Sequence, residues 1–331
     1  DPELSRGLGD VYKRQNLYNI NMFLNISLLI ISIATLVFGA ERFVDASSKI
    51  ARKFGISDLF VGLTIVALGT SAPEIFVAIS SVINSAEAVA IGTIVGSNIT
   101  NIALIFGVSC FAINQIKKRF SLESLIPFLL SFLLFLFALK DLKFSLIESL
   151  GFIAILFYFL VILSKERSNV IEVVSGNSDM LKNFIMLLMG LVLLVVGSNF
   201  AVIYAEKFAL SIGISEVIVG LTILALGTSL PELAATVSAI FKGKNQMVIG
   251  NIIGSNILNL VIIVPIIGIF SSAVMPIELW ERDSSPLIIL TLAFTLIMLL
   301  LSRVQMPKYL GILLGFGFIS FYMIYVLNLS N

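Results

Sequence analysis

The chain contains the same sequence twice. Residues 61–74 read VGLTIVALGTSAPE, and residues 219–232 read VGLTILALGTSLPE. Further along, IGTIVGSNITN at 91–101 matches IGNIIGSNILN at 249–259. Both matches have the same offset, 219 − 61 = 158 residues, and about 30 of the roughly 67 pairs that begin with Leu36 and end with Ile102 are identical. Such a duplication restricts the fold to two structurally equivalent halves.

The apolar content of the chain is that of a membrane protein. Hydrophobic residues make up 58% of the sequence and charged residues only 12%, about half the charge of a typical soluble protein. Stretches long enough to cross a membrane lie near 21–41, 58–83, 89–114, 122–139, 146–164, 181–201, 216–241, 247–272, 285–302 and 308–328. They predict an all-α polytopic membrane protein with ten transmembrane helices, five in each half.

Five helices per half is an odd number, so the second half enters the membrane from the opposite side and the repeats have inverted topology. The predicted division is a disordered or non-native tail at 1–20, a first five-helix repeat at 21–164, a cytoplasmic linker at 165–180 and a second five-helix repeat at 181–331. Lys and Arg gather in the loops on the side of that linker. The other side has, apart from the tail, only Lys140, Lys143, Lys207 and Arg282. This bias predicts a multi-pass protein of the cell membrane (inner or plasma membrane) with both termini outside.

The residue types that are missing exclude several kinds of chemistry. The chain has no His and a single Cys, Cys110, so it lacks the usual ligands of zinc, haem and iron–sulfur centres. A Ser-His-Asp triad and a histidine proton relay are excluded as well. We expect no cofactor and no enzyme activity, and a net charge of +1 gives no reason to expect nucleic acid as a partner. The oxygen ligands that remain suit hard cations such as Na⁺ and Ca²⁺.

The second helix of each half carries a stripe of oxygen atoms. Thr70, Ser71 and Glu74 share one helix face with Ala67, because their spacing is i, i+3, i+4 and i+7. The second half repeats the stripe as Ala225, Thr228, Ser229 and Glu232. A proline precedes each acid, and a proline inside a helix frees a backbone carbonyl and kinks the helix. Both helices should therefore bend beside their stripes.

The third helix of each half adds hydroxyl and amide groups. Ser97 and Asn101 are one turn apart, and the second half repeats this pair as Ser255 and Asn259. Glycines at small-xxx-small spacing should let these helices pack closely against their neighbours, Gly92 with Gly96 and Gly250 with Gly254. Four helices can then converge on one site, where two carboxylates balance one Ca²⁺ and neutral oxygens complete a shell of about 6–8 ligands.

Simpler explanations exist for most of these residues taken singly. A Ser or Thr in a membrane helix usually bonds its own backbone, and glycine pairs are usually packing devices. The acids are harder to explain in this way, because a charge at mid-membrane costs roughly 2.5–3.5 kcal/mol. Glu74 and Glu232 incur that cost at equivalent positions, which indicates function. By contrast, Glu41 and Asp45 fall near the end of the first helix, where water should solvate them.

The paired motifs GTSxPE and GSNxxN resemble the alpha-1 and alpha-2 repeats of the sodium/calcium exchanger family, prokaryotic type, in the cation/calcium antiporter superfamily. The resemblance covers the chain after about residue 20. It implies ten helices in two inverted repeats around one central site. That site would open to each face in turn and exchange several Na⁺ for one Ca²⁺. By analogy, the first and sixth helices, with Gly39 and Gly197, would be the sliding element.

The resemblance also implies roles for single residues. Glu74 and Glu232 resemble the family's pair of Ca²⁺ ligands, which also helps to bind Na⁺. The family's flanking ligands have counterparts in this chain: the hydroxyls of Thr70, Ser71, Ser97, Thr228, Ser229 and Ser255, the backbone carbonyls of Ala67 and Ala225, and the amides of Asn101 and Asn259 resemble them. One position departs, because several prokaryotic exchangers and the potassium-dependent branch carry Asp where this chain has Asn259. We therefore expect no K⁺ co-transport.

Several functions are open on this sequence. The leading hypothesis is Na⁺/Ca²⁺ antiport by a functional monomer whose partners are the two ions and the lipid bilayer. The alternative is a H⁺/Ca²⁺ exchanger in which the Glu pair takes up protons, because two nearby buried acids resist being ionised together. A scaffold would not need repeated buried acids, and a channel would more naturally line a pore by oligomerisation. An enzyme would need a nucleophile–base pair, a metal-hydrolase ligand set or a nucleotide loop, and none is found.

Overall fold

The chain is helical throughout the part that the structure describes. The computed structural model describes residues 2–112, 122–166, 179–214, 225–271, 274–304 and 306–329, with side chains from Met22 onward except those of Leu122 and Ala225. These ranges contain helices and no strand, which confirms the all-α prediction for them. The predicted tail at 1–20 has no described side chains, and most of the predicted linker at 165–180 lies outside the described residues. Both stay predictions.

The first half consists of one long helix, two interrupted helices and a hairpin. In chain order its elements are α1 (Pro2–Lys53), α2 (Asp58–Val61), the π-helix η1 (Gly62–Val66), α3 (Ala67–Thr70), α4 (Ala72–Ile83), α5 (Glu87–Thr100), the π-helix η2 (Asn101–Ile105), α6 (Phe106–Cys110), the 3₁₀ turn η4 (Leu122–Ser124), α7 (Leu125–Ala138) and α8 (Leu146–Glu166).

The second half follows the same plan. Its elements are α9 (Met180–Ser211), α11 (Ala225–Gly227), α12 (Leu230–Phe241), α13 (Asn245–Leu258), the π-helix η6 (Asn259–Ile263), α14 (Val264–Phe270), α15 (Glu278–Glu281), α16 (Ser284–Leu301) and α17 (Lys308–Asn328). The bounds of α4, α5 and η2 recur in α12, α13 and η6 after the same 158 residues (230 − 72). The duplication seen in the sequence is thus present in the secondary structure, whereas the inverted orientation of the halves stays a prediction.

The first and sixth helices are longer than the apolar windows at 21–41 and 181–201 predicted. α1 continues to Lys53 and α9 to Ser211, so both window ends were wrong. Beyond residue 41 the side chains of Phe43, Val44 and Ala51 remain buried, so packing holds a segment helical that hydropathy alone excludes. Each helix stops just before a glycine in the left-handed region, Gly55 at φ 64° and Gly213 at φ 85°, as helix C-termini often do.

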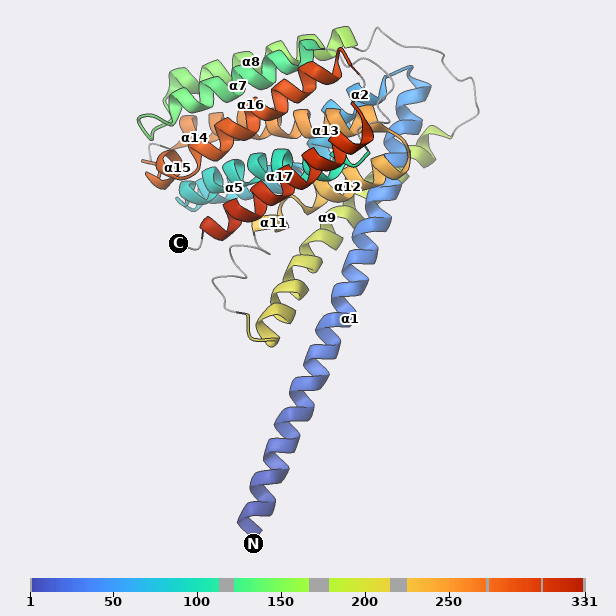
Figure 1. Cartoon of the computed structure of the whole chain (residues 1–331), viewed down its shortest axis with the longest axis vertical. Helices are drawn as coiled ribbons and strands as arrows, with labels where there is room; N and C mark the ends of the chain where they lie inside the picture. The colour runs from blue at the N-terminus through green and yellow to red at the C-terminus, as the bar shows by residue number, and fades with distance from the viewer. Residues whose placement is uncertain are drawn as a thin grey trace.

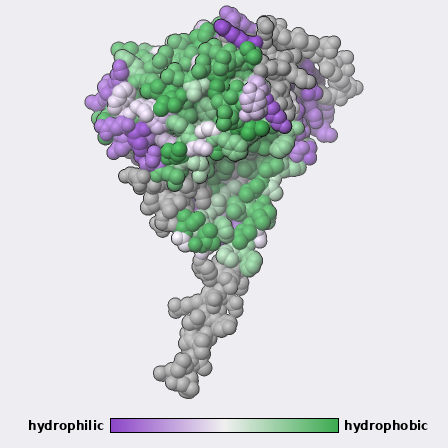
Figure 2. Space-filling model, viewed as in Figure 1, coloured by the Kyte–Doolittle hydropathy of each residue, from purple (hydrophilic) through white to green (hydrophobic). Residues whose placement is uncertain are grey.

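The described helices are long and apolar enough for a multi-pass membrane protein. Seven of them can cross a membrane by length and composition, and the pair Asp58–Thr70 and Ala72–Ile83, bent by 45°, is either a broken span or a re-entrant loop. Leu125–Ala138 and Leu230–Phe241 are shorter apolar helices. Figure 2 shows apolar residues over most of the visible face, with polar residues gathered towards two opposite edges. The number of ten spans stays a prediction.

α1 and α9 lie side by side and leave the remaining helices at an angle, while α7, α8, α14, α16, α13, α5 and α17 form the layered body (Figure 1). The two helices touch through backbone. A Cβ added at Gly39 would lie against the backbone of Leu194, and one added at Gly197 would lie against the backbone of Leu36. These contacts are reciprocal between the halves, so the pair can approach more closely than side chains would allow.

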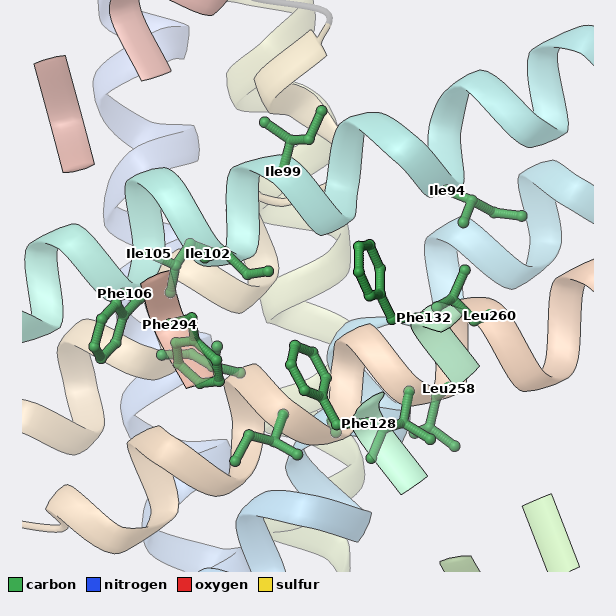
Figure 3. Packing of buried hydrophobic residues seen from close by; sticks show 14 of the residues in the cluster. Ile94, Ile99, Ile102, Ile105, Phe106, Phe128, Phe132, Leu258, Leu260 and Phe294 are labelled. Carbon is green, nitrogen blue, oxygen red and sulfur yellow. The ribbon is translucent and has the colours of Figure 1, made fainter. Parts of the chain in front are cut away.

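The core of the body is built where α5–η2–α6 passes α13–η6. Ile94, Ile99 and Ile102 line one side of the close view in Figure 3, and Phe128, Phe132 and Leu258 lie among the residues facing them. Phe106 meets Phe294 edge to face, with ring centroids 4.8 Å apart. All these side chains are buried. The packing fixes the two motif-bearing helices, and with them the residues described next.

Candidate functional site

Two broken helices present the acids of the repeated motif. α3 stops at Ser71 (φ −82°, ψ 2°) and α4 begins at once, with a proline in its first turn. In the second half, Ser229 (φ −91°, ψ 3°) separates α11 from α12 in the same way. The predicted interruption is therefore confirmed in both halves, and in the first half the two helices meet at a bend of 45°. The interruptions place Glu74 and Glu232 in the first turn of a helix, where backbone N–H groups favour a negative charge.

Both acids are fully buried, and hydroxyl groups from two helices hold one oxygen of each. Glu74 is 0% exposed and Glu232 is 1% exposed. Ser97 Oγ donates to Glu74 Oε1 at 3.2 Å, and Ser71 Oγ donates to Glu232 Oε1 at 2.9 Å. Ser97 Oγ also lies 3.4 Å from Thr228 Oγ1. Since Ser71 and Thr228 each reach across to the other half, the two copies of the motif form one cluster, as the sequence predicted.

The two motif copies also hold buried polar atoms without a partner among the described residues. They are the second carboxylate oxygens of Glu74 and Glu232, the hydroxyls of Ser229 and Ser255, both side-chain polar atoms of Asn101 and Oδ1 of Asn259. Burying a polar group costs free energy unless something replaces the water it has lost. Most of these atoms are oxygens with lone pairs, so a cation bound among them would supply that compensation.

Thr70 and Ala67 lie beside the cluster but fit the predicted ligand roles less well. The Thr70 hydroxyl lies 3.3 Å from the Ala67 carbonyl, the ordinary backbone bond of a helical Thr, and 3.4 Å from Asn251 Oδ1. The Ala67 carbonyl also accepts the Ser71 N–H at 2.9 Å. The Ser71 N–H already uses one of the two lone pairs of that carbonyl, which leaves it less capacity for an ion. Ala225 begins α11, and its side chain is not among those described.

Three polar residues of the site were missed in the sequence. Asn251 accepts from Thr70 and donates to Thr236 Oγ1 at 3.2 Å, and Asn98 Oδ1 accepts from Asn259 Nδ2 at 3.2 Å. Asn98 belongs to the repeated GSN triplet, so its recurrence was a signal that could have found it. Asn251 aligns with Thr93 in the other copy and Thr236 with Ala78, so no repeat pattern marked them.

Two π-helical turns were also missed, and they begin at the amide positions. η2 starts at Asn101 and η6 starts at Asn259, at the same offset in the two halves. A π turn inserts an extra residue into a helix and often occurs at functional sites. Here it interrupts the third helix of each half at the level of the cluster.

The cluster relies on two carboxylates and neutral oxygens. Across the described part of the chain, no three His, Cys, Asp or Glu side chains come together as metal ligands do. Two acids among hydroxyls and amides form a site for a hard cation.

The chain is similar to known membrane proteins along almost its whole length. The inner membrane protein YrbG of Escherichia coli (strain K12) is 31% identical over 311 residues, which covers 90% of this chain and 95% of YrbG. The sodium/calcium exchanger MaX1 of Methanosarcina acetivorans is 28% identical over 347 residues, covering 90% and 97%.

A solved structure shares the fold. It is the sodium-calcium exchanger NCX_Mj soaked with 2.5 mM Na⁺ and 0.1 mM Sr²⁺, with a TM-score of 0.75 and 28% identity over 92% of this chain and 98% of that one. The model of the family described as sodium/calcium exchanger protein matches residues 24–165 and 182–330. The interlocked motif copies and these similarities lead to one conclusion: the chain belongs to the sodium/calcium exchanger protein family.

Proposed function

We propose that this chain exchanges Na⁺ for Ca²⁺ across a membrane, at a site built around Glu74 and Glu232. One observation carries the proposal. The two acids come from different halves, are completely buried, and each keeps one oxygen without a hydrogen-bond partner among the described residues. Buried acids in membrane helices mark ion pathways. Membership of the exchanger family makes the chain a cation/Ca²⁺ antiporter rather than an enzyme.

Charge balance supports Ca²⁺ as one substrate. Two carboxylates neutralise one Ca²⁺, and the hydroxyls of Ser97, Thr228, Ser229 and Ser255 with the amides of Asn101 and Asn259 supply the kind of neutral oxygens that Ca²⁺ accepts. Na⁺ takes the same hard oxygen ligands. MaX1 is named a sodium/calcium exchanger, and NCX_Mj was soaked with Na⁺ and Sr²⁺.

Burial of the acids explains how the two ion flows are coupled. With no cation bound, the site would carry two charges in a low-dielectric interior, which costs free energy at every step that excludes water. A bound Ca²⁺ or a set of Na⁺ ions removes that charge. The loaded protein can therefore pass through a closed state and the empty one cannot, which is the condition for obligatory exchange. The α1–α9 pair, joined through backbone at Gly39 and Gly197, is the element proposed to slide.

We also propose an orientation. The distribution of Lys and Arg puts both termini outside and residues 165–180 in the cytoplasm. An epitope tag at the C-terminus should react with antibody on intact spheroplasts, whereas one inserted near residue 172 should react only after permeabilisation. The opposite result would reverse the assignment of every loop.

Ca²⁺ uptake into proteoliposomes tests the exchange itself. Vesicles loaded with Na⁺ should take up Ca²⁺, and vesicles loaded with choline should not. Glu74→Gln should abolish uptake, whereas Glu123→Gln, a matched change at an exposed position before α7, should leave it intact. Uptake driven by a pH gradient without Na⁺ would replace the proposal with the H⁺/Ca²⁺ alternative, because the same Glu pair can also carry protons.

A further inference from the structure

A cavity lies beside the proposed ion site and carries a charge cluster of its own. Its volume is about 320 Å³, and its lining runs from Ser97 and Thr228 of the site to Arg282, Asp283 and Tyr325. These last three residues come from the segment before α16 and from α17. In Figure 1, α15 and the C-terminal end of α17 lie at the same end of the bundle. The cavity therefore joins the site to one end of the molecule.

The cavity borders the third helix of the first half, and its remaining lining comes from the second half. It is lined by Gly92 and Gly96 of α5, where an added Cβ would meet no described atom within 4 Å. The segment 217–224, equivalent to the neighbours of the matching glycines in α13, lies outside the described residues, so close packing at this pair stays a prediction. Gly250 and Gly254 are the matching residues of α13, and there the prediction is confirmed. A Cβ at Gly250 would lie 2.8 Å from Leu63 N, and one at Gly254 would lie 2.9 Å from Leu63 Cα. Backbone of η1 thus fills the glycine face of α13.

Asp283 is the buried member of the charge cluster. Its side chain is 3% exposed, whereas that of Arg282 is 45% exposed. The guanidinium of Arg282 binds both carboxylate oxygens of Asp283, with Nε to Oδ1 at 2.7 Å and Nη2 to Oδ2 at 2.9 Å. Tyr325 donates its hydroxyl to Oδ1 at 3.1 Å. The carboxylate thus neutralises the arginine and fixes its position against α17.

We propose that this Arg282–Asp283–Tyr325 cluster sets the electrostatic potential on the path by which Na⁺ and Ca²⁺ reach the site from the outer face. The proposal rests on the proposed function, and on the predicted topology for the name of the face. An arginine beside a cation path repels cations unless a carboxylate cancels its charge. Asp283 then determines the apparent affinity for Na⁺ and Ca²⁺ on the outer face without contacting the bound ion.

Asp283→Asn is the most direct test, because it keeps the size of the side chain and leaves the charge of Arg282 uncancelled. The potential acts twice as strongly on a divalent ion. We expect the outer-face KM to rise about 10-fold for Ca²⁺ but only about threefold for Na⁺. The interaction energy of Ca²⁺ with the potential is twice that of Na⁺, so the factor by which KM rises for Ca²⁺ is the square of the factor for Na⁺. The increase should shrink when choline chloride raises the ionic strength, because salt screens the unpaired charge.

Rescue separates this role from a merely structural one. Arg282→Gln should lower the outer-face KM for Ca²⁺ below that of the wild type, and the double variant Arg282→Gln/Asp283→Asn should return it close to the wild-type value. Arg303→Gln removes the same charge from an exposed position at the opposite end of α16 and should leave the outer-face KM unchanged. If Asp283→Asn does not fold, the sign of the Arg282→Gln effect still tests the proposal.

Right-side-out and inside-out vesicles measure KM on the two faces separately. The expected result is a change on the outer face with none on the inner face. Equal changes on both faces, or a double variant that keeps the full defect of Asp283→Asn, would overturn the proposal. A wild-type protein without Na⁺-dependent Ca²⁺ uptake would instead overturn the proposed function, so the two failures are distinguishable.

Discussion

The third helices of the two halves have nearly the same motif, but the described residues around them differ. α13 packs its glycines onto the backbone of η1, whereas the glycines of α5 border a cavity. Their lengths and their π turns agree residue for residue after the 158-residue offset. The difference therefore does not come from the motif. The neighbours of the α13 glycines are residues 59–67, whereas residues 217–224 of the equivalent segment in the second half lie outside the described residues.

The acids provide the largest test of whether the two copies are equivalent in function. Glu74→Gln and Glu232→Gln should each reduce Na⁺-dependent Ca²⁺ uptake on the order of 100-fold or more, because removing one charge from a buried set costs about 3–5 kcal/mol. Uptake of radioactive Ca²⁺ by vesicles measures this. A variant that retains most of its activity would show that one half dominates the site.

The glycines test the difference in packing. Gly250→Ala should destabilise the protein by about 1–3 kcal/mol, because the new methyl group meets backbone that cannot move aside cheaply. Gly92→Ala should be neutral or stabilising by about 0.5–1 kcal/mol, since alanine is the better helix former and no described atom lies within 4 Å of the new methyl group. Thermal unfolding of both variants in the same detergent makes the comparison. Equal losses would mean that α5 is as tightly packed as α13.

The two amide positions allow a finer comparison. Asn259 Nδ2 donates to Asn98, whereas neither side-chain polar atom of Asn101 has a partner among the described residues. Asn259→Asp should therefore lower stability by about 0.5–1.5 kcal/mol more than Asn101→Asp, which is the value of one hydrogen bond. Unfolding curves at one fixed pH report the difference. The reverse order would indicate that the Asn98 contact contributes nothing.

The smallest effect is expected at Lys242, which pairs with Glu41 at 3.4 Å and with Asp45 at 2.9 Å. All three side chains are partly exposed, so Lys242→Ala should cost only about 0.2–1 kcal/mol, and less in high salt. Denaturation at two salt concentrations checks this. A loss that salt does not reduce would indicate that the lysine acts through packing.

Much of this molecule could be predicted because the sequence states its main features twice. The acids, the interruptions at Ser71 and Ser229 and the cross-contact of the two motifs all follow from repeated residue types. What could not be predicted depends on contacts between distant segments. The Glu41 and Asp45 side chains are partly exposed, as expected, but they also bind Lys242 more than 190 positions away. The π turns leave no composition signal, because they change the winding of a helix and not its residues.

The crossing of α1 and α9 has a consequence for the origin of the chain. Gly39 meets Leu194 while Gly197 meets Leu36, so residue and partner exchange places between the halves. Reciprocity of this kind is the property of a contact between two identical subunits. An ancestral half that carried one such glycine could have made both contacts by pairing with a second copy of itself. Gene fusion would then have released each copy to change alone, as the different residues at the equivalent positions of Thr93 and Asn251 now record.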